Sequence, residues 1–284
     1  MLRLAVEQGH RVRALTRRDQ PAVAGVHWIA GDLGFPGDLC AGADAVIHLA
    51  GTINAPDRAG FDAGNVAGTA SIVAAAQAAC IKRFIHVSSL AAREPGLSDY
   101  GASKAAAEGL VLGSGLDTAI VRPPGIYGPG DRETLPVFQM ITRGFAVLPG
   151  PGRFSLIEVG DVAAALLAVV ASDYSGLAEL DDGHGGYFHR ELAIAIGVAV
   201  GRRPWLIPLS TGVLDVAALV ATALARITGG SPLLSYDRAR YLAHADWVAA
   251  PAAALPSAVR GAPVDLRTGL ARTVAWYRQA GLLR

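Results

Sequence analysis

The sequence predicts an α/β fold, a doubly wound parallel sheet followed by a smaller C-terminal lobe. Apolar runs of strand length alternate with segments of helical periodicity over residues 1–123, the pattern of a parallel sheet with crossover helices. Apolar residues make up 52% of the 284 positions and charged residues 17%, so the chain can bury a large core without disulfides. Proline and glycine become frequent after residue 123, where the alternation ends.

Each predicted element follows from a local pattern. Residues 2–8 have the spacing of a helix, which Gly9 ends. Short apolar runs predict strands at residues 11–16, 26–30, 45–50, 83–89 and 118–123. Apolar residues at helical spacing predict helices at residues 64–80, 98–113 and 161–172, the last with Asp161 as its N-cap. Beyond residue 175 the pattern predicts Ala-rich helical segments and loops.

Charge and histidine placement exclude several kinds of site. The 25 basic and 24 acidic residues leave a formal net charge of +1, so no basic surplus favours nucleic acid. His184 and His189 have no carboxylate or cysteine at metal-binding spacing, so no metal site is expected. The histidines in predicted strands are interpreted as satisfied core or edge residues: His27, His48 and His86.

The expected compartment is a reducing cytoplasm. Cys40 and Cys80 form no disulfide framework, and the N-terminus lacks the pattern of a signal peptide. Mean hydropathy is +0.36, but the longest apolar run, residues 213–228, contains Asp215 and Arg226. This run is shorter than the ~20 residues that a membrane span requires. We expect a buried or docked helix there, with membrane contact at most peripheral.

The motif with the most chemical content is YGASK at residues 100–104, on a predicted helix. Tyr100 and Lys104 lie one turn apart, so their side chains share a helical face. A free tyrosine has a pKa near ~10, and an ammonium close by would stabilise the phenolate during proton transfer. Ser89 ends the predicted strand 83–89 and could hold a substrate oxygen. A bare YxxxK pattern also occurs on ordinary surface helices, but the flanking strands favour the functional interpretation.

Several motifs occur in an order typical of one family. They are GHRVRALTRR (9–18), GDL (31–33), VIHLAG (46–51), NVAGTASIV (65–73), FIHVSS (84–89), YGASK (100–104), VRPPGIYGPGD (121–131), FSLIEVGDVAAALL (154–167) and TVAWYRQAGLL (273–283). Along almost its whole length the sequence resembles the extended short-chain dehydrogenase/reductases, the NAD(P)-dependent epimerase/dehydratase group. The resemblance implies a Rossmann-like sheet, a nicotinamide cofactor and hydride transfer to or from a carbon that bears oxygen.

The resemblance also implies catalytic roles. Tyr100 would be the general acid/base, Lys104 its electrostatic partner and ribose ligand, and Ser89 the group that holds the substrate oxygen. Asn65 is similar to a helix asparagine of the family, but a local hydrogen-bonding role fits the sequence equally well.

Cofactor contacts are expected at the ends of the predicted strands. The resemblance implies Asp32 and Leu33 at the adenine, Ala50 and Gly51 in the cofactor groove, and Pro123 and Pro124 beside the nicotinamide. Arg17 and Arg18 stand where an NAD-preferring site would place an acidic residue. Two guanidinium groups can bind a 2′-phosphate, so NADP is the expected cofactor and NAD the alternative. The other interpretation of these arginines is a solvated basic loop.

Departures from the family pattern favour one class of substrate over another. Gly125 stands where nucleotide-sugar enzymes usually have an asparagine, and LAARE (90–94) replaces their V-Y-G. These changes favour a small or apolar carbonyl or alcohol over a UDP-sugar. The expected division is a dinucleotide-binding domain at residues 1–172, with 124–157 contributing to the substrate cleft, and a substrate-binding lobe at 173–284. A homodimer is compatible with the sequence.

The sequence starts inside the helix that normally follows the family's glycine-rich phosphate-binding turn. In the strand order 3-2-1-4-5-6, the first strand lies between the strands predicted at 11–16 and 45–50. We therefore expect a gap in the centre of the sheet. We also expect a working protein longer than 284 residues, and aggregation or weak dinucleotide binding of the chain as given.

Two functions from different classes fit these observations. The first is an NAD(P)-dependent oxidoreductase or epimerase of the extended short-chain dehydrogenase type. The second is a non-catalytic NADPH-binding scaffold resembling the dehydrogenase-like accessory subunit of respiratory complex I. The presence of both Tyr100 and Lys104 favours the enzyme.

Overall fold

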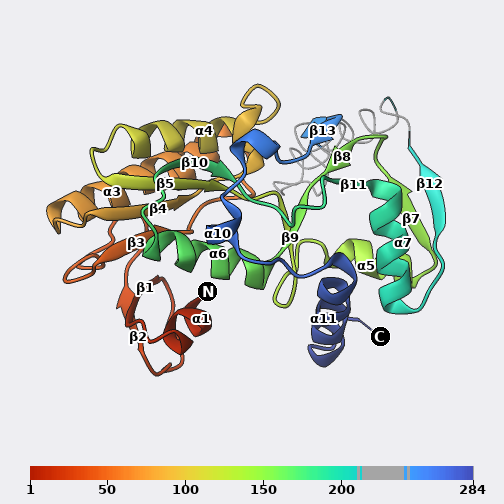
Figure 1. Cartoon of the computed structure of the whole chain (residues 1–284), viewed down its shortest axis with the longest axis horizontal. Helices are drawn as coiled ribbons and strands as arrows, with labels where there is room; N and C mark the ends of the chain where they lie inside the picture. The colour runs from red at the N-terminus through yellow and green to blue at the C-terminus, as the bar shows by residue number, and fades with distance from the viewer. Residues whose placement is uncertain (210–211, 213–239, 242–243, 284) are drawn as a thin grey trace. The chain divides into compact units, whose positions relative to one another are not determined.

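A computed structural model describes residues 1–209, 212, 240–241 and 244–283 (Figure 1). Its contacts divide the chain into two compact units. One unit, the sheet unit, comprises Met1–Arg122, Ala163–Ala178 and Leu255–Gly261. The other, the lobe, comprises Pro123–Val162, Glu179–Ala254 and Ala262–Arg284. A domain division after residue 172 stays a prediction.

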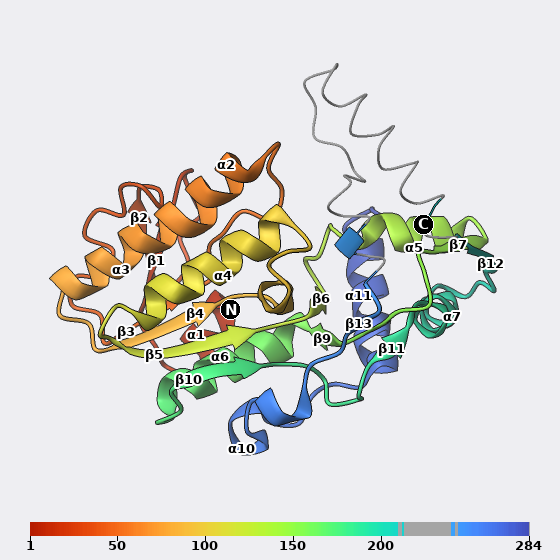
Figure 2. The ribbon, with the colours of Figure 1, turned by 90° about the horizontal axis from the view of Figure 1, so that it is seen from above.

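The sheet unit contains the predicted parallel strands. β3 (Ala45–His48), β4 (Arg83–Val87) and β5 (Asp117–Arg122) are hydrogen-bonded in parallel, and β10 (Gly176–Glu179) lies beside β5. All of β4 is buried, because helices cover both faces of this sheet. Figure 2 shows α3 (Gly68–Ala78) and α4 (Asp99–Leu112) on one face and α6 (Val159–Ala171) on the other.

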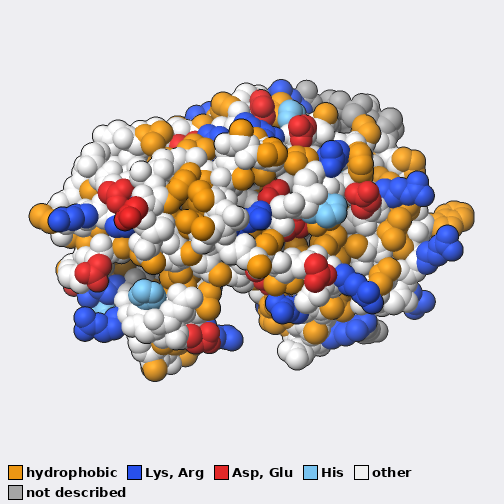
Figure 3. Space-filling model, in the orientation of Figure 1, with side chains coloured by type: hydrophobic (Ala, Val, Ile, Leu, Met, Phe, Trp, Pro, Cys, Tyr) orange, Lys and Arg blue, Asp and Glu red, His pale blue; other side chains and the backbone are white. Residues whose placement is uncertain are grey.

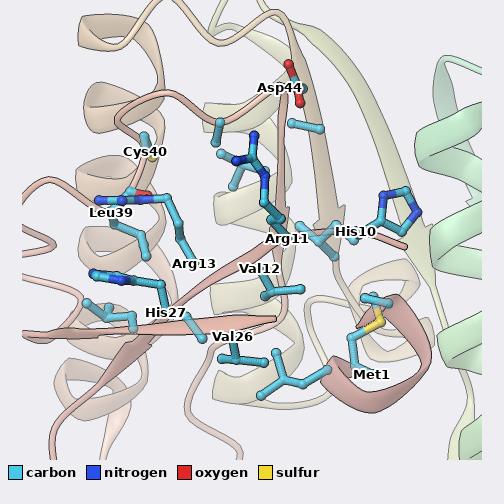
Figure 4. A pocket seen from close by; sticks show the side chains of 18 of the residues that line it. Met1, His10, Arg11, Val12, Arg13, Val26, His27, Leu39, Cys40 and Asp44 are labelled. Carbon is cyan, nitrogen blue, oxygen red and sulfur yellow. The ribbon is translucent and has the colours of Figure 1, made fainter. Parts of the chain in front are cut away.

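The centre of the sheet is interrupted, as the sequence predicts. β1 (Val12–Thr16) pairs in parallel with β2 (Val26–Ala30), but among the described strands neither bonds to β3. A cavity of about 1060 Å³ separates β1 from β3. Figure 4 shows side chains of β1 and β2 along it, near Met1 at the start of α1 (Leu2–Glu7). Apolar residues from α3 and α6 also line it, including Ile72, Leu167 and Val170.

Two helices differ from the prediction. In place of one helix at 64–80, the chain forms α2 (Arg58–Phe61), a π-helical turn at Asp62–Ala67 and then α3. The prediction of Asp161 as an N-cap is wrong, because α6 starts at Val159. The Asp161 carboxylate instead accepts a hydrogen bond from the Val264 amide at 2.8 Å. The Glu158 carboxylate accepts from the Gly160 amide at 2.6 Å, as a capping group does.

The lobe has its own apolar core. Its elements include β6 (Gly125–Tyr127), α5 (Leu135–Thr142), β7 (Phe145–Leu148), β8 (Arg153–Phe154), β9 (Leu156–Glu158), β11 (Tyr187–Phe188), α7 (His189–Val200), β12 (Trp205–Pro208), β13 (Asp246–Trp247) and α11 (Leu266–Gln279). Tyr277 of α11 is fully buried in this core, with its ring edge-on to Phe138 at 5.1 Å between centroids. Trp276 packs against the same core.

The short helix α10 (Ser257–Arg260) belongs to the sheet unit. The helix predicted at 213–228 lies outside the described residues. Within the described part of the chain, no helix combines the length and the apolar character needed to cross a bilayer.

Candidate functional site

The predicted catalytic residues come from two neighbouring elements of the sheet unit. Tyr100 and Lys104 lie in the first turns of α4, which Ser98 caps by accepting a hydrogen bond from the Gly101 amide at 3.0 Å. Ser89 follows β4 and caps a 3-10 turn by accepting from the Ala91 amide at 3.2 Å. The chain therefore places these side chains beyond the carboxyl end of a buried parallel strand, where ligands bind in open α/β sheets.

Ser89 and Tyr100 are in direct contact. The Ser89 hydroxyl hydrogen-bonds to the phenol of Tyr100 and favours its ionised form. Burial acts more strongly in the opposite direction, so the pKa of Tyr100 lies above its ordinary value. The ring of Phe61 lies 6.0 Å from that of Tyr100 and contributes to this apolar surrounding. Tyr100 is therefore a protonated phenol at neutral pH, with a hydroxyl neighbour.

Lys104 is buried below the strand end. Its ammonium donates a hydrogen bond to the Val87 carbonyl at 2.8 Å. Lys104 as a whole is only 5% exposed. Burial lowers the pKa of Lys104 to about 8, while the Glu108 carboxylate opposes this shift. An ammonium has three N–H donors, of which the Val87 carbonyl uses one. The role of Lys104 as the electrostatic partner of Tyr100 stays a prediction.

Asn65 ties α4 to the loop after β3. Its side-chain oxygen accepts from the Thr52 amide at 2.6 Å, and its amide donates to the Thr52 carbonyl at 2.9 Å and to Ser103 Oγ at 2.8 Å. Ser103 Oγ in turn donates to the Tyr100 carbonyl at 2.8 Å. Asn65 is 1% exposed and lies in the π-helical turn. Its hydrogen bonds thus fix the backbone that carries Tyr100.

A second connection joins α4 to β5. Arg122, the last residue of β5, donates to both oxygens of Glu108, at 2.8 and 2.6 Å. Both side chains are largely buried, so the paired geometry compensates the loss of hydration. Sequence reasoning missed this pair because the two residues are distant in sequence and each alone is an ordinary charged position.

The candidate cofactor residues follow the other strands of the sheet unit. Arg17 and Arg18 lie exposed just after β1, Asp32 and Leu33 follow β2, and Ala50 and Gly51 follow β3. The Asp32 carboxylate accepts from the Gly34 and Phe35 amides, at 2.8 and 3.0 Å, and shapes its own turn. A methyl group on Gly51 would lie 2.8 Å from Asn65 Oδ1, so only glycine leaves this groove open. Pro123 and Pro124 follow β5 and belong to the other unit.

Two histidines lie beneath the site. His48 and His86 sit opposite each other on β3 and β4, with their rings stacked at 5.4 Å. His48 Nε2 is 3.0 Å from Thr69 Oγ1, which satisfies one ring nitrogen. His86 is fully buried, but neither of its ring nitrogens has a partner among the described residues, nor does Ser88 Oγ. The prediction of satisfied core histidines is therefore confirmed for His48 and wrong for His86.

Burial and the nearby Lys104 ammonium lower the pKa of both imidazoles, to about 4 for His48. They are neutral at physiological pH and add no charge beside Lys104. Within the described part of the chain, no cluster of histidine, cysteine and carboxylate side chains could hold a metal ion.

The comparisons with known proteins identify the family of the chain. The sequence matches an NAD(P)H-binding family model over residues 1–173. It is 40% identical over 301 aligned residues to a ceramide reductase of Caulobacter vibrioides, covering 100% of this chain and 92% of that protein. It is 33% identical over 198 residues to a Stigmatella aurantiaca enzyme named 4-hydroxy-2-methyl-3-oxo-4-farnesyl-3,4-dihydroquinoline-1-oxide ketoreductase. That match covers 59% of each chain.

The fold is shared with solved structures. The enzyme WbmG of Bordetella bronchiseptica, solved in complex with NAD and UDP, superposes with a TM-score of 0.73 at 18% sequence identity. The superposition covers 99% of this chain and 91% of that one. At this identity the likeness concerns the fold alone.

Proposed function

This chain belongs to the NAD(P)H-binding family of extended short-chain dehydrogenase/reductases, and we propose that it reduces the ketone of a lipid-like substrate with NADPH. Its general activity, that of an NAD(P)-dependent reductase or epimerase, follows from the family and from the full-length relative. The observation that supports the ketone reduction is the Ser89–Tyr100 hydrogen bond beside the buried Lys104. The lipid-like substrate is supported by the relatives, and NADPH by Arg17 and Arg18.

The state of Tyr100 suits the role of a proton donor. Its raised pKa keeps the phenol protonated at neutral pH, so Tyr100 Oη can donate a proton to a carbonyl oxygen as that oxygen gains negative charge. Ser89 Oγ hydrogen-bonds to the same phenol and can hold the substrate oxygen next to it. A bound reduced nicotinamide would supply the hydride. Lys104 would hold the ribose through N–H donors that the Val87 carbonyl does not use, and its charge would stabilise the phenolate left after proton transfer.

The residues present fit a dinucleotide. Gly51 keeps an open groove beside Asn65 and Lys104, since a side chain there would collide with the Asn65 amide. Asp32 and Leu33 would meet the adenine at the end of β2, Ala50 would line the groove with Gly51, and Pro123 and Pro124 would lie beside the nicotinamide. The exposed Arg17 and Arg18 would bind a ribose 2′-phosphate, which supports NADPH over NADH.

The substrates in the names of the two relatives support an apolar substrate. Ceramide and a farnesyl-bearing quinoline both carry long hydrocarbon groups, and both relatives are reductases. Gly125 and residues 90–94 also depart from the nucleotide-sugar pattern. The alternative of a non-catalytic scaffold is not favoured, because Ser89, Tyr100 and Lys104 are all present and the full-length relative is an enzyme.

The test is turnover by the purified chain. NADPH oxidation is followed with β-keto amides of graded acyl length, and the epimerisation of UDP-sugars is followed separately by product analysis. We expect kcat/KM to rise with acyl length and UDP-sugars to give no turnover. Tyr100→Phe should abolish the reaction, whereas Tyr174→Phe, a partly exposed tyrosine away from the site, should not. Tight NADPH binding without turnover of any ketone would contradict the proposal.

Arg17→Asp tests the cofactor assignment. The exchange should weaken NADPH binding by about tenfold or more and leave NADH binding nearly unchanged, since only the 2′-phosphate loses its partner. Isothermal titration with both cofactors measures this directly. Equal loss for both cofactors would contradict the 2′-phosphate contact.

A further inference from the structure

The outer face of a two-stranded sheet in the lobe is entirely apolar. β7 and β12 pair in parallel, with Phe145 opposite Trp205 and Val147 opposite Ile207. Because side chains alternate along a strand, these four residues share one face. The other face of the same strands carries Ala146, which is buried, and Leu148 and Leu206, which pack on the lobe core.

Three of the four outer residues are exposed to solvent. Trp205 is 83% exposed, Ile207 40% and Phe145 37%, and Val147 is half-buried. A sheet that covers a core on one side normally presents polar side chains on the other. Scattered apolar residues on a surface are ordinary, but a contiguous set on one sheet face is typical of an interaction site.

Three arginines lie in the chain just before the two strands of this face. Arg143 precedes β7, Arg202 and Arg203 precede β12, and all three are exposed. The two strands begin side by side, since the Trp205 amide donates to the Gly144 carbonyl at 2.8 Å. Residues 134–157 and 192–209, which contain both strands and the three arginines, include no carboxylate. Figure 3 shows hydrophobic and basic side chains together at the end of the molecule that carries β12 and α7.

We propose that this face, defined by Phe145, Val147, Trp205 and Ile207 with Arg143, Arg202 and Arg203, docks onto the surface of a membrane that contains anionic lipids. Tryptophan and arginine suit that interface, because the indole and the aliphatic stem enter the apolar layer while the polar ends remain among the headgroups. Each arginine near an anionic surface strengthens binding about fivefold. A symmetric contact with a second copy fits less well, since it would bring the two arginine sets together without acidic partners.

Vesicle binding tests this inference independently of the catalytic chemistry. The full chain is sedimented with vesicles of phosphatidylcholine alone or mixed with phosphatidylglycerol. We expect binding to the mixed vesicles that weakens with salt, and a loss of about 100-fold for the triple variant Arg143→Gln/Arg202→Gln/Arg203→Gln. Trp205→Ser should lower binding at least tenfold, and brominated lipids should quench wild-type fluorescence more than that of Trp205→Ser.

Two matched control variants distinguish a specific role of this face from the effect of losing charge or an exposed aromatic side chain anywhere on the surface. The triple variant Arg132→Gln/Arg190→Gln/Arg272→Gln removes the same charge from other exposed positions, and Phe35→Ser removes an aromatic residue that is 82% exposed in the sheet unit. Both should bind vesicles like the wild type. Equal losses in test and control variants, or no binding to mixed vesicles, would overturn the inference. A concentration-dependent dimer that Trp205→Ser dissociates would overturn it too, because the face would then join two copies.

Discussion

Tyr100 is the proposed proton donor, and it combines a raised pKa with a hydrogen-bonding neighbour, Ser89. Tyr100→Phe removes the proton donor and leaves the ring contact with Phe61 in place. We expect kcat to fall by about 10²–10⁴-fold, the range for a placed acid or base, with the NADPH dissociation constant changed less than about twofold. Steady-state kinetics and cofactor titration measure the two quantities. A near-normal kcat would contradict the role of Tyr100.

Cys80 has a backbone conformation that favours glycine. It ends α3 with a φ of 57°, in a motif where the Ile81 amide donates to the Ala76 carbonyl at 2.9 Å and the Cys80 amide to the Gln77 carbonyl at 3.0 Å. Cys80→Gly should raise the free energy of unfolding by about 0.5–1 kcal/mol, because glycine adopts this conformation without strain. Urea unfolding measures the change. Cys80→Ala keeps a Cβ atom and should give no such gain, which makes it the matched control.

The stacked histidines make stability depend on pH. The folded-state pKa of His48 is about 4 against about 6.5 for a free imidazole, and that of His86 is lowered in the same direction. Between these values the unfolded chain binds more protons than the folded chain. The stabilisation is therefore complete above pH ~6.5 and is lost as the pH falls towards about 4.

His86→Leu tests this dependence. The substitution removes two buried nitrogens that have no partner among the described residues, so stability at neutral pH should stay the same or rise. The decrease in unfolding free energy between pH 7 and pH 5 should become smaller than in the wild type, as urea titrations at both pH values would show. An unchanged decrease would mean that other groups dominate the acid response.

At the scale of elements, the π-helical turn at Asp62–Ala67 positions α4 through Asn65. Asn65→Ala leaves the Thr52 amide and carbonyl and the Ser103 hydroxyl without their partner. We expect a loss of about 2–3 kcal/mol in unfolding free energy and a higher KM for NADPH, because the loop after β3 loosens. Ser103→Ala should cost less. A double-mutant cycle should give a coupling energy near ~1 kcal/mol, and simple additivity would contradict a direct Asn65–Ser103 interaction.

The elements that the sequence predicts well are those whose signal is local. The strands β3, β4 and β5 are predicted from short apolar runs in the sequence. The YGASK motif lies on α4, the helix that the sequence pattern predicts. The π-helical turn could not be predicted in this way, because its register depends on hydrogen bonds from Asn65 to Thr52 and Ser103. Nor could the role of Asp161, since its partner Val264 is distant in the chain.

The same reasoning applies to the candidate site. Ser89, Tyr100 and Lys104 could be proposed from the sequence because their spacing is short and chemically distinctive. The Glu108–Arg122 pair and the unpartnered His86 were not, because they become distinctive only when α4 and β5, or β3 and β4, are packed together. Local spacing therefore indicates candidate reacting groups, whereas the side chains packed around them are known only from tertiary contacts.

At the scale of the whole molecule, the two units have separate apolar cores. The lobe core includes Phe138, Leu270 and Tyr277, and a core of the sheet unit includes Ile72, Phe84 and Ile120. The outer face of β7 and β12 belongs to the lobe alone. Trp205 lies in neither of these two cores.

The interruption between β1 and β3 implies that amide protons exchange in two stages. No residue of β1 is buried and only Ile29 of β2 is, whereas every residue of β4 is buried. β1 and β2 can therefore open as a pair without breaking a backbone bond to β3. Hydrogen–deuterium exchange should show β1 and β2 exchanging through a local opening that responds weakly to urea, and β4 and β5 only through global unfolding. Equal protection of both strand pairs would mean that the sheet unit unfolds as a single cooperative body despite its divided sheet.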